Sequence, residues 1–307
     1  LPGIVWAEVV LVTGGSGFIA QYCIDELLEK GFEVRATIRD QNSLSYLKSK
    51  YSDRVKLFIT DLNSDYNWEQ AFEGANVLMH ISSPVPAAPS SLQDIYEPAV
   101  GGTIRVLKLA DKYKISKVIL TSSISAASYN IEGREINSEV FSKFSDLKPH
   151  EYYAFSKTSA EKAAWDFVAE NKSIKLTTIL PPWVLGPGIG NHLEATSFKL
   201  FNALAKKEMP VAPPLKFGLV DVRDVAKMHI AALENDDSIG KRIIVAENTY
   251  WAKEVAQKLV ENGYDAPTFT PPAFIVKFLA RFDATLKGVR PIIGLDYKIN
   301  SDRAKTL

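Results

Sequence analysis

Short runs of apolar, often β-branched residues alternate with helix-like segments through the first 180 residues of this 307-residue chain. In the helix-like segments, apolar residues recur every three or four positions, as on one face of an α-helix. Strands that alternate with helices are typical of a parallel sheet, because a parallel connection must cross over the sheet. The pattern therefore predicts an α/β fold with a doubly wound parallel sheet. The predicted strands are 9–12, 33–39, 55–59, 77–81, 118–121 and 176–180.

The regular alternation ends near residue 180, and six prolines fall between positions 181 and 214. We therefore expect a nucleotide-binding body over residues 1–180 and a smaller lobe over residues 181–307, which would mainly bind substrate. The segment 242–246 is a candidate strand that returns to the sheet, within a returning segment near 215–247. The cluster from Pro84 to Pro89 is interpreted as a stiff active-site loop, with a surface linker as the alternative.

Charge and hydropathy exclude several classes of protein. Lysine plus arginine and aspartate plus glutamate each number 36, so the net charge is zero and nucleic acid is not an expected partner. No stretch approaches the roughly 18 apolar residues that span a bilayer. Residues 1–12 are apolar but contain Glu8 and lack a basic region, so they are interpreted as leading into a first strand and not as a signal peptide.

The chain contains one cysteine, Cys23, which excludes an intrachain disulfide. This fits a reducing compartment, so we expect a cytoplasmic protein. Cys23 itself is expected to be a small buried apolar side chain. The four histidines are far apart in sequence, and with a single cysteine no metal site is expected.

A glycine turn follows the first predicted strand, with the spacing Gly14-x-x-Gly17-x-x-Ala20. In Rossmann-type folds the first glycine makes the tight turn, the second admits a pyrophosphate, and the small third residue packs the helix on the strand. The start of the next helix then faces the anion. The position of the turn between strand and helix favours a dinucleotide site over an ordinary structural turn.

The second predicted strand ends in Thr37-Ile38-Arg39-Asp40. Enzymes that use NAD usually carry an acidic residue at this point, which binds the adenosine ribose. Arg39 occupies that position here, and a guanidinium would bind the 2′-phosphate of NADPH. The alternatives are that Arg39 is a solvated charge at the strand end, or that a shift of one residue makes Asp40 the discriminating side chain.

Tyr153 and Lys157 lie four positions apart at the start of a predicted helix, which places them on one face. A tyrosine is a poor acid or base at neutral pH, and a nearby lysine cation can help to lower its pKa. About thirty residues earlier, a strand ends in Thr121-Ser122-Ser123, where a hydroxyl can hold a substrate carbonyl. Taken singly, the first motif is better explained as a half-buried aromatic beside a solvated lysine, and the second as a serine-rich turn.

The glycine turn, the Thr-Ser-Ser strand end and the Tyr-x-x-x-Lys helix occur in order, and together the sequence resembles the extended short-chain dehydrogenase/reductases. Within them it is similar to the dihydroflavonol-reductase-like branch, and most to fungal NADPH-dependent aldehyde and methylglyoxal reductases. Supporting segments are His80-Ile-Ser-Ser-Pro84, Pro98-Ala-Val-Gly-Gly-Thr103, Pro181 to Pro187, Ala195-Thr-Ser197 and Asp221-Val-Arg-Asp-Val-Ala226.

The resemblance implies an NADPH-dependent carbonyl reductase that transfers a hydride to an aldehyde or ketone. In this family pattern, Tyr153 donates a proton, Lys157 lowers the tyrosine pKa and holds the nicotinamide ribose, and Ser123 binds the carbonyl, with Ser122 as the alternative serine. Trp183 and Phe198 are candidate apolar walls of the substrate site. The implied cofactor contacts are Gly14, Gly17, Phe18, Ile19, Arg39, Asp61, Leu62, Tyr153, Lys157, Pro181, Val184 and Ser197.

The chain departs from the family pattern in two places. Plant members carry a lysine seven residues after the phosphate-binding arginine, where this chain has Tyr46, which bears on the strength of the preference for NADPH. Family members also commonly continue with a Leu-Gly pair, an aromatic residue and a final helix, beyond the point at which this sequence ends, Leu307.

Two other functions remain open from the sequence. One is an NAD(P)-dependent epimerase or dehydratase that acts on a sugar nucleotide, against which Arg39 and the segment from His80 to Pro84 argue. The other is a non-catalytic NADP-binding sensor, which would normally lack the tyrosine or the lysine. Hydrolase chemistry is disfavoured because the chain has no Gly-x-Ser-x-Gly elbow. The expected partner is a small-molecule carbonyl substrate, and we expect a monomer or a homodimer.

Overall fold

The computed structural model describes residues 8–83, 91–189, 196–282 and 289–307. Its centre is a seven-stranded sheet in the order β10-β7-β5-β4-β1-β2-β3, and every strand pair in it is parallel. This confirms the predicted fold class, and the six predicted strands are found with ends that differ by at most one residue. The strands are β1 (Val9–Thr13), β2 (Glu33–Ile38), β3 (Val55–Ile59), β4 (Val77–His80), β5 (Lys117–Thr121), β7 (Lys175–Leu180) and β10 (Arg242–Ile244).

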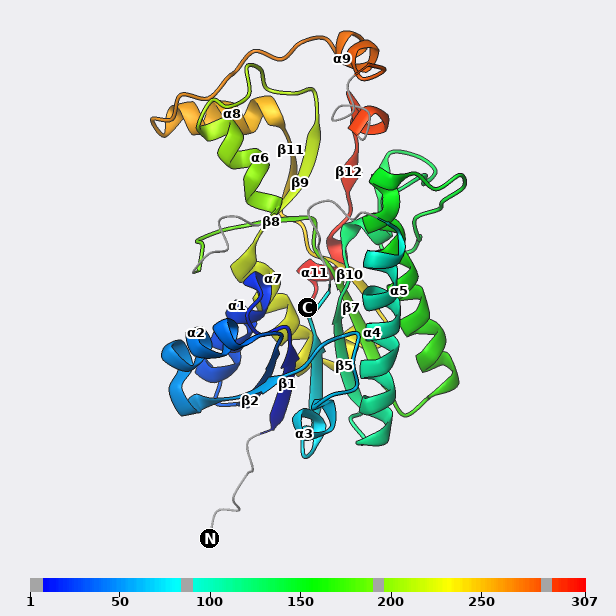
Figure 1. The fold of residues 1–307 in the computed structure, drawn as a ribbon. Coiled ribbons are helices and arrows are strands. Elements are labelled where there is room, and N and C mark those ends of the chain that lie inside the picture. Colours follow the sequence, from blue (N-terminus) through cyan, green and yellow to red (C-terminus); the bar gives the residue numbers. More distant parts are fainter. Residues whose placement is uncertain (1–7, 84–90, 190–195, 283–288) are drawn as a thin grey trace.

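Helices cover both faces of this sheet (Figure 1). On one face α1 (Phe18–Glu29) packs beside α7 (Val222–Glu234), with α2 (Gln41–Tyr51) nearby. On the other face α4 (Gln93–Lys112) packs along α5 (Tyr152–Glu170), with α3 (Trp68–Phe72) below them. Strand β1 supplies both cores: Val10 and Val12 belong to the first cluster and Leu11 to the second. Burial on both faces explains why its sequence is continuously apolar.

A smaller lobe lies beyond the carboxyl edge of the sheet, at the top of Figure 1. Its three-stranded sheet has the order β11 (Asn248–Trp251), β9 (Lys216–Asp221) and β8 (Trp183–Leu185). The helices α6 (Thr196–Ala205), α8 (Ala252–Glu261) and α9 (Ala273–Leu279) belong to this lobe. The expected return to the main sheet is confirmed, because β10 pairs with β7, although it ends two residues before Ala246.

Short elements complete the structure. Strands β6 (Glu135–Ile136) and β12 (Lys298–Ile299) pair with each other, and α11 (Asp302–Lys305) follows them. Within the described ranges no helix is long and apolar enough to cross a membrane. The described 3-10 helices are Ser52–Arg54, Ile124–Ala126, Pro149–Glu151, Asp236–Ser238 and Arg290–Ile292.

Cys23 lies on the inner face of α1 with no exposed surface. Burial raises the pKa of its thiol. The prediction that this cysteine acts as a small apolar core residue is therefore confirmed.

His229 on α7 is fully buried, and its Nδ1 lies 2.8 Å from the Val225 carbonyl oxygen, so Nδ1 carries the proton and donates. Its Nε2 then accepts from the Thr121 hydroxyl at 2.7 Å. Burial lowers the pKa of His229 to about 4, below the ordinary value of 6.5. Between these values the unfolded chain binds more protons, so acid favours unfolding.

We therefore predict that His229→Gln makes the protein less acid-sensitive, since glutamine keeps a polar group but does not titrate. The difference between the free energies of unfolding at pH 7 and pH 5, measured by urea denaturation, should shrink by about 2 kcal/mol. An unchanged difference would contradict the assignment of a neutral, buried imidazole.

Candidate active site

The order in which the chain adds strands to the sheet reverses between β1 and β4. Ligands of doubly wound folds bind beside this point, at the carboxyl ends of the strands. The glycine turn leaves β1 here. Gly14 has φ +69°, and a Cβ at this position would lie 3.0 Å from Cα of Ser82, which follows β4. Both the backbone conformation and the close approach require glycine.

Gly15 is a contributor to the turn that the sequence analysis missed. Its N–H donates to the Thr37 carbonyl at 2.7 Å, and a Cβ on it would lie 2.7 Å from the Ala36 side chain. The turn is therefore pressed against β2. The double glycine of Thr13-Gly14-Gly15 was the available signal, but the family spacing draws attention only to Gly14 and Gly17.

The first turn of α1 is open to an anion. Its N-cap is Gly17, which has no side chain to cap the helix, and its first turn contains no acidic residue. Phe18 and Ile19 are the first two helical residues, and the first intrahelical amide is that of Gln21, which donates to the Gly17 carbonyl at 3.0 Å. Because the start of a helix attracts anions through its backbone N–H groups and its dipole, these residues fit the pyrophosphate of a dinucleotide.

The structure separates the roles of Arg39 and Asp40 at the end of β2. The Asp40 carboxylate caps α2 by accepting from the Ser43 N–H at 2.8 Å, and this hydrogen bond lowers the Asp40 pKa. Arg39 is exposed and forms no hydrogen bond or ion pair with any residue that the structure describes. Tyr46, which replaces the lysine of plant relatives, donates to the Gln21 side chain at 3.3 Å. Of these groups, the Arg39 guanidinium is the one left available to a ligand.

Asp61 and Leu62 follow β3 at the same edge of the sheet. The Asp61 carboxylate accepts from the Asn63 N–H at 2.7 Å, and its backbone carbonyl accepts from the Trp68 indole at 2.9 Å. Leu62 packs on Gly102 of α4, where a Cβ would lie 2.9 Å from the Leu62 side chain. Both predicted adenine contacts are thus fixed in place by the chain itself.

The two serines after β5 point to different partners. The Ser122 hydroxyl donates to the Glu161 carboxylate at 2.7 Å, away from the tyrosine. The buried Ser123 hydroxyl instead accepts from the Ser125 N–H at 3.1 Å and lies close enough to the Tyr153 phenol to lower its pKa. This geometry favours Ser123 over Ser122 as the serine that meets a substrate.

Tyr153 and Lys157 are on one face of α5, as predicted. The Lys157 ammonium is buried and donates to the Thr121 carbonyl at 3.0 Å, and burial lowers its pKa to about 8 while the Glu161 charge opposes this shift. The Tyr153 pKa differs from the expectation: burial raises it above 10, and only the Ser123 hydrogen bond acts in the other direction. The phenol therefore stays protonated at neutral pH, which is the form that donates a proton.

His80 at the end of β4 is a second group that the sequence analysis did not place in the site. The Thr13 hydroxyl donates to its Nδ1 at 2.7 Å and accepts from the N–H groups of Ile81 and Ser82. Burial, with the nearby Lys157 charge, lowers the His80 pKa to about 3. His80 is thus a neutral group that joins the ends of β1 and β4. No group of three potential metal ligands occurs in the described residues.

The remaining predicted contacts lie where β7 leads into the small lobe. The Pro181 carbonyl accepts from the Ile124 N–H at 3.0 Å, next to the serine turn, and Val184 is buried in β8. Ser197 is in the first turn of α6, but its side chain and the segment Pro84–Pro89 fall outside the described residues. Phe198 packs edge-on against Phe18, with ring centroids 5.4 Å apart.

Trp183 was expected to form an apolar wall of the substrate site. Its ring packs edge-on against Phe201 and Phe217, with centroids 6.2 and 5.5 Å apart. These contacts place it against the core of the small lobe, and its side chain is only partly exposed. The role of Trp183 in substrate binding stays a prediction.

A parallel doubly wound sheet, an uncapped helix start after a glycine turn, and a Ser-Tyr-Lys group at the same sheet edge define a nucleotide-dependent enzyme of the short-chain dehydrogenase/reductase type. Residues 10–246 match the model of the NAD dependent epimerase/dehydratase family. The chain therefore belongs to this family, the extended short-chain dehydrogenase/reductases.

Its relatives include several reductases. The chain is 33% identical to cinnamoyl-CoA reductase CAD2 of Medicago truncatula, over 81% of this chain and 79% of the relative. It is 32% identical to the NADPH-dependent methylglyoxal reductase GRE2 of Saccharomyces cerevisiae, over 82% of each chain. Among solved structures, that of Gre2 from Candida albicans in complex with NADPH is 28% identical, with a TM-score of 0.80 over 97% of this chain and 92% of that one. The predicted resemblance to the dihydroflavonol-reductase-like branch and the prediction of an NADPH-dependent oxidoreductase agree with these relatives.

Proposed function

We propose that this protein is an NADPH-dependent reductase of aldehydes or ketones in which Tyr153 is the proton donor. The observation that carries the proposal is that Ser123, Tyr153 and the buried Lys157 come together at the sheet edge where the glycine turn lies, close enough for Ser123 to act on the Tyr153 pKa. Two hydroxyls that converge on one point can both bind a carbonyl oxygen. The named reductases among the relatives support the same chemistry.

The residues of the chain have distinct roles in this proposal. Bound NADPH would supply a hydride to the carbonyl carbon. Ser123 orients the carbonyl oxygen, and the protonated Tyr153 hydroxyl gives its proton to that oxygen. The Lys157 ammonium stabilises the phenolate that remains and holds the nicotinamide ribose. The turn formed by Gly14 and Gly17 would hold the pyrophosphate, and the lobe over residues 181–307 would determine which substrate fits.

The proposal is tested by following absorbance at 340 nm with purified protein, NADPH or NADH, and a panel of carbonyl compounds. The panel includes methylglyoxal, branched aldehydes, aryl ketones, diketones and a dihydroflavonol. We expect consumption of NADPH with at least one class of compound, and slower consumption of NADH. Tight NADPH binding without turnover of any compound would favour the sugar-nucleotide enzyme or the non-catalytic sensor.

Arg39 is proposed to bind the 2′-phosphate, and its removal should affect NADPH alone. We predict that Arg39→Ala raises the KM for NADPH about 10- to 100-fold, because charge-assisted hydrogen bonds to the phosphate are lost. The KM for NADH should stay within about twofold. The control is Arg54→Ala, which removes an exposed arginine from the turn after α2. Equal effects on both cofactors would argue against the assignment.

A further inference from the structure

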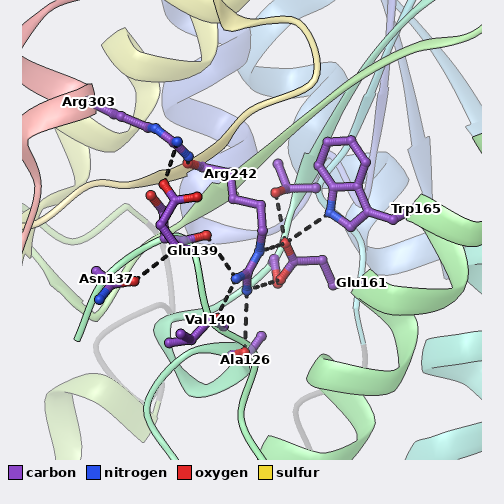
Figure 2. A network of polar contacts seen from close by, with 11 residues as sticks. Ala126, Asn137, Glu139, Val140, Glu161, Trp165, Arg242 and Arg303 are labelled. Carbon is purple, nitrogen blue, oxygen red and sulfur yellow. Dashed lines mark hydrogen bonds and ion pairs between the residues drawn. The ribbon is translucent and has the colours of Figure 1, made fainter. Parts of the chain in front are cut away.

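Glu161 is a fully buried carboxylate one helical turn after Lys157 on α5. Figure 2 shows that its two oxygens are the centre of a network of polar contacts. They accept from the hydroxyls of Ser122 and Thr178 at 2.7 and 2.8 Å, and from the Trp165 indole at 3.3 Å. A carboxylate is seldom fully buried unless it has a specific partner, and here the partner is an arginine from a distant strand.

That arginine is Arg242, the first residue of β10, and all five of its N–H donors are used. Two of them bind the Glu161 carboxylate at 2.7 and 3.1 Å. The other three bind the backbone carbonyls of Ala126, Ser138 and Val140, at 3.3, 3.1 and 2.5 Å (Figure 2). The guanidinium also lies over the Phe141 ring, 3.7 Å from its centroid.

The network joins the parts of the fold that carry the proposed catalytic groups. Glu161 is on the same helix as Tyr153 and Lys157, and it binds Ser122, the residue before Ser123. Arg242 binds the carbonyl of Ala126, which closes the turn that begins at Ser123. The helix and the serine turn are thus both hydrogen-bonded to one buried ion pair, which links the position of Ser123 to that of α5.

Stability alone does not explain such a pair. Removing two charges from water costs several kcal/mol per ion, and well-packed apolar residues are often as stable in the same place. A small cavity is lined in part by Ser82, Thr103, Ser122, Lys157 and Glu161, so the carboxylate and the lysine border the same space. The Glu161 charge raises the pKa of this lysine, against the effect of burial.

We propose that Glu161 and Arg242 are positioning residues of the reductase site: the pair holds the Ser123 turn against α5 and keeps a negative charge behind Lys157. The proposal rests on the reductase function proposed above. The titratable groups that interact with the Lys157 charge are Glu161 from α5 and the neutral His80 from β4. Glu161 is the one fixed negative charge that raises the Lys157 pKa among the described residues.

The test uses Glu161→Gln, which keeps the size of the side chain and removes its charge. We expect kcat for carbonyl reduction to fall about 10- to 100-fold while the Kd for NADPH changes little. The alkaline limb of the pH profile of kcat should move to lower pH by about one unit, because the Lys157 ammonium loses its partner charge. Glu161→Asp, which retains the charge in a shifted place, should lower kcat but leave the limb near its wild-type position.

A matched control removes a buried hydrogen bond in β7, the strand that also carries Thr178, at a side chain that does not bind Glu161 or Arg242. Thr177→Val deletes hydrogen bonds to Ser238, whereas Thr178 binds Glu161. Thr177→Val should lower stability and leave the alkaline limb unchanged. If Glu161→Gln does not fold, Glu161→Gln/Arg242→Met removes the unpaired arginine charge as well, and it carries the same expectation for the limb.

Two results distinguish failure of the positioning role from failure of the proposed function. An alkaline limb that stays in place in Glu161→Gln or in the double variant would overturn the positioning role, even if kcat falls through general loosening of the fold. If instead Tyr153→Phe retains wild-type turnover, the proposed function itself fails, whatever the Glu161 variants do.

Discussion

Replacing Tyr153 by phenylalanine is expected to lower kcat for carbonyl reduction about 100- to 10,000-fold, the range that a lost general acid typically costs. The substitution removes one oxygen from a side chain whose hydroxyl meets Ser123 at the end of β5. The Kd for NADPH, measured by fluorescence, should change by less than about threefold. The variant should therefore lose turnover but keep its affinity for NADPH, as expected when the missing group acts on the reacting atoms.

The neighbouring tyrosine provides the matched control. Tyr152 is in the same first turn of α5, and its hydroxyl forms no hydrogen bond with another described residue. Tyr152→Phe should keep wild-type kcat. Tyr153 is not the proton donor if both variants keep wild-type kcat, or if both lose activity to the same extent.

Replacing Lys157 by methionine is expected to lower kcat about 100- to 1,000-fold, because a preorganised charge beside the developing phenolate is lost. The wild-type enzyme should also lose activity as the pH rises through the Lys157 pKa of about 8, where the ammonium is deprotonated. The variant should lack this alkaline limb. Lys162→Met, which removes an exposed lysine from the same helix, is the control and should leave both kcat and the limb unchanged.

The same variant should be more stable than the wild type. Burial lowers the Lys157 pKa from 10.5 to about 8, so below pH 8 the folded state carries the cost of a desolvated ammonium. Between pH 8 and 10.5 the unfolded chain binds more protons, and the free energy of unfolding of the wild type should rise with pH. Lys157→Met should raise the free energy of unfolding at pH 7, by up to about 3 kcal/mol, measured by urea denaturation. Loss of stability together with loss of activity would instead indicate a structural lysine.

The parts of the fold and site that the sequence predicted are those encoded locally. The strands follow from short apolar runs, and the glycine turn from the spacing of Gly14 and Gly17. The i, i+4 spacing of Tyr153 and Lys157 fixes their shared helix face once a helix forms. These features needed no knowledge of which strands are neighbours.

Features that depend on distant contacts were not predicted. Glu161 and Arg242 are 81 residues apart, and neither belongs to a motif that links them. The choice between Ser122 and Ser123 required knowing which hydroxyl meets Glu161 and which meets Tyr153. The upward shift of the Tyr153 pKa reflects burial by the assembled site, which spacing on one helix cannot report.

The central claim is that hydride reaches a carbonyl carbon while Tyr153 protonates the oxygen. The most direct measurement uses NADPH that carries deuterium at the transferred position of the nicotinamide, with the best carbonyl compound of the panel, and analyses the product by mass spectrometry. The account predicts that the wild type forms an alcohol with one deuterium on the carbinol carbon, and that Tyr153→Phe forms almost no alcohol in the same time. An alcohol without deuterium from the wild type, or equal amounts of labelled alcohol from the two proteins, would contradict it.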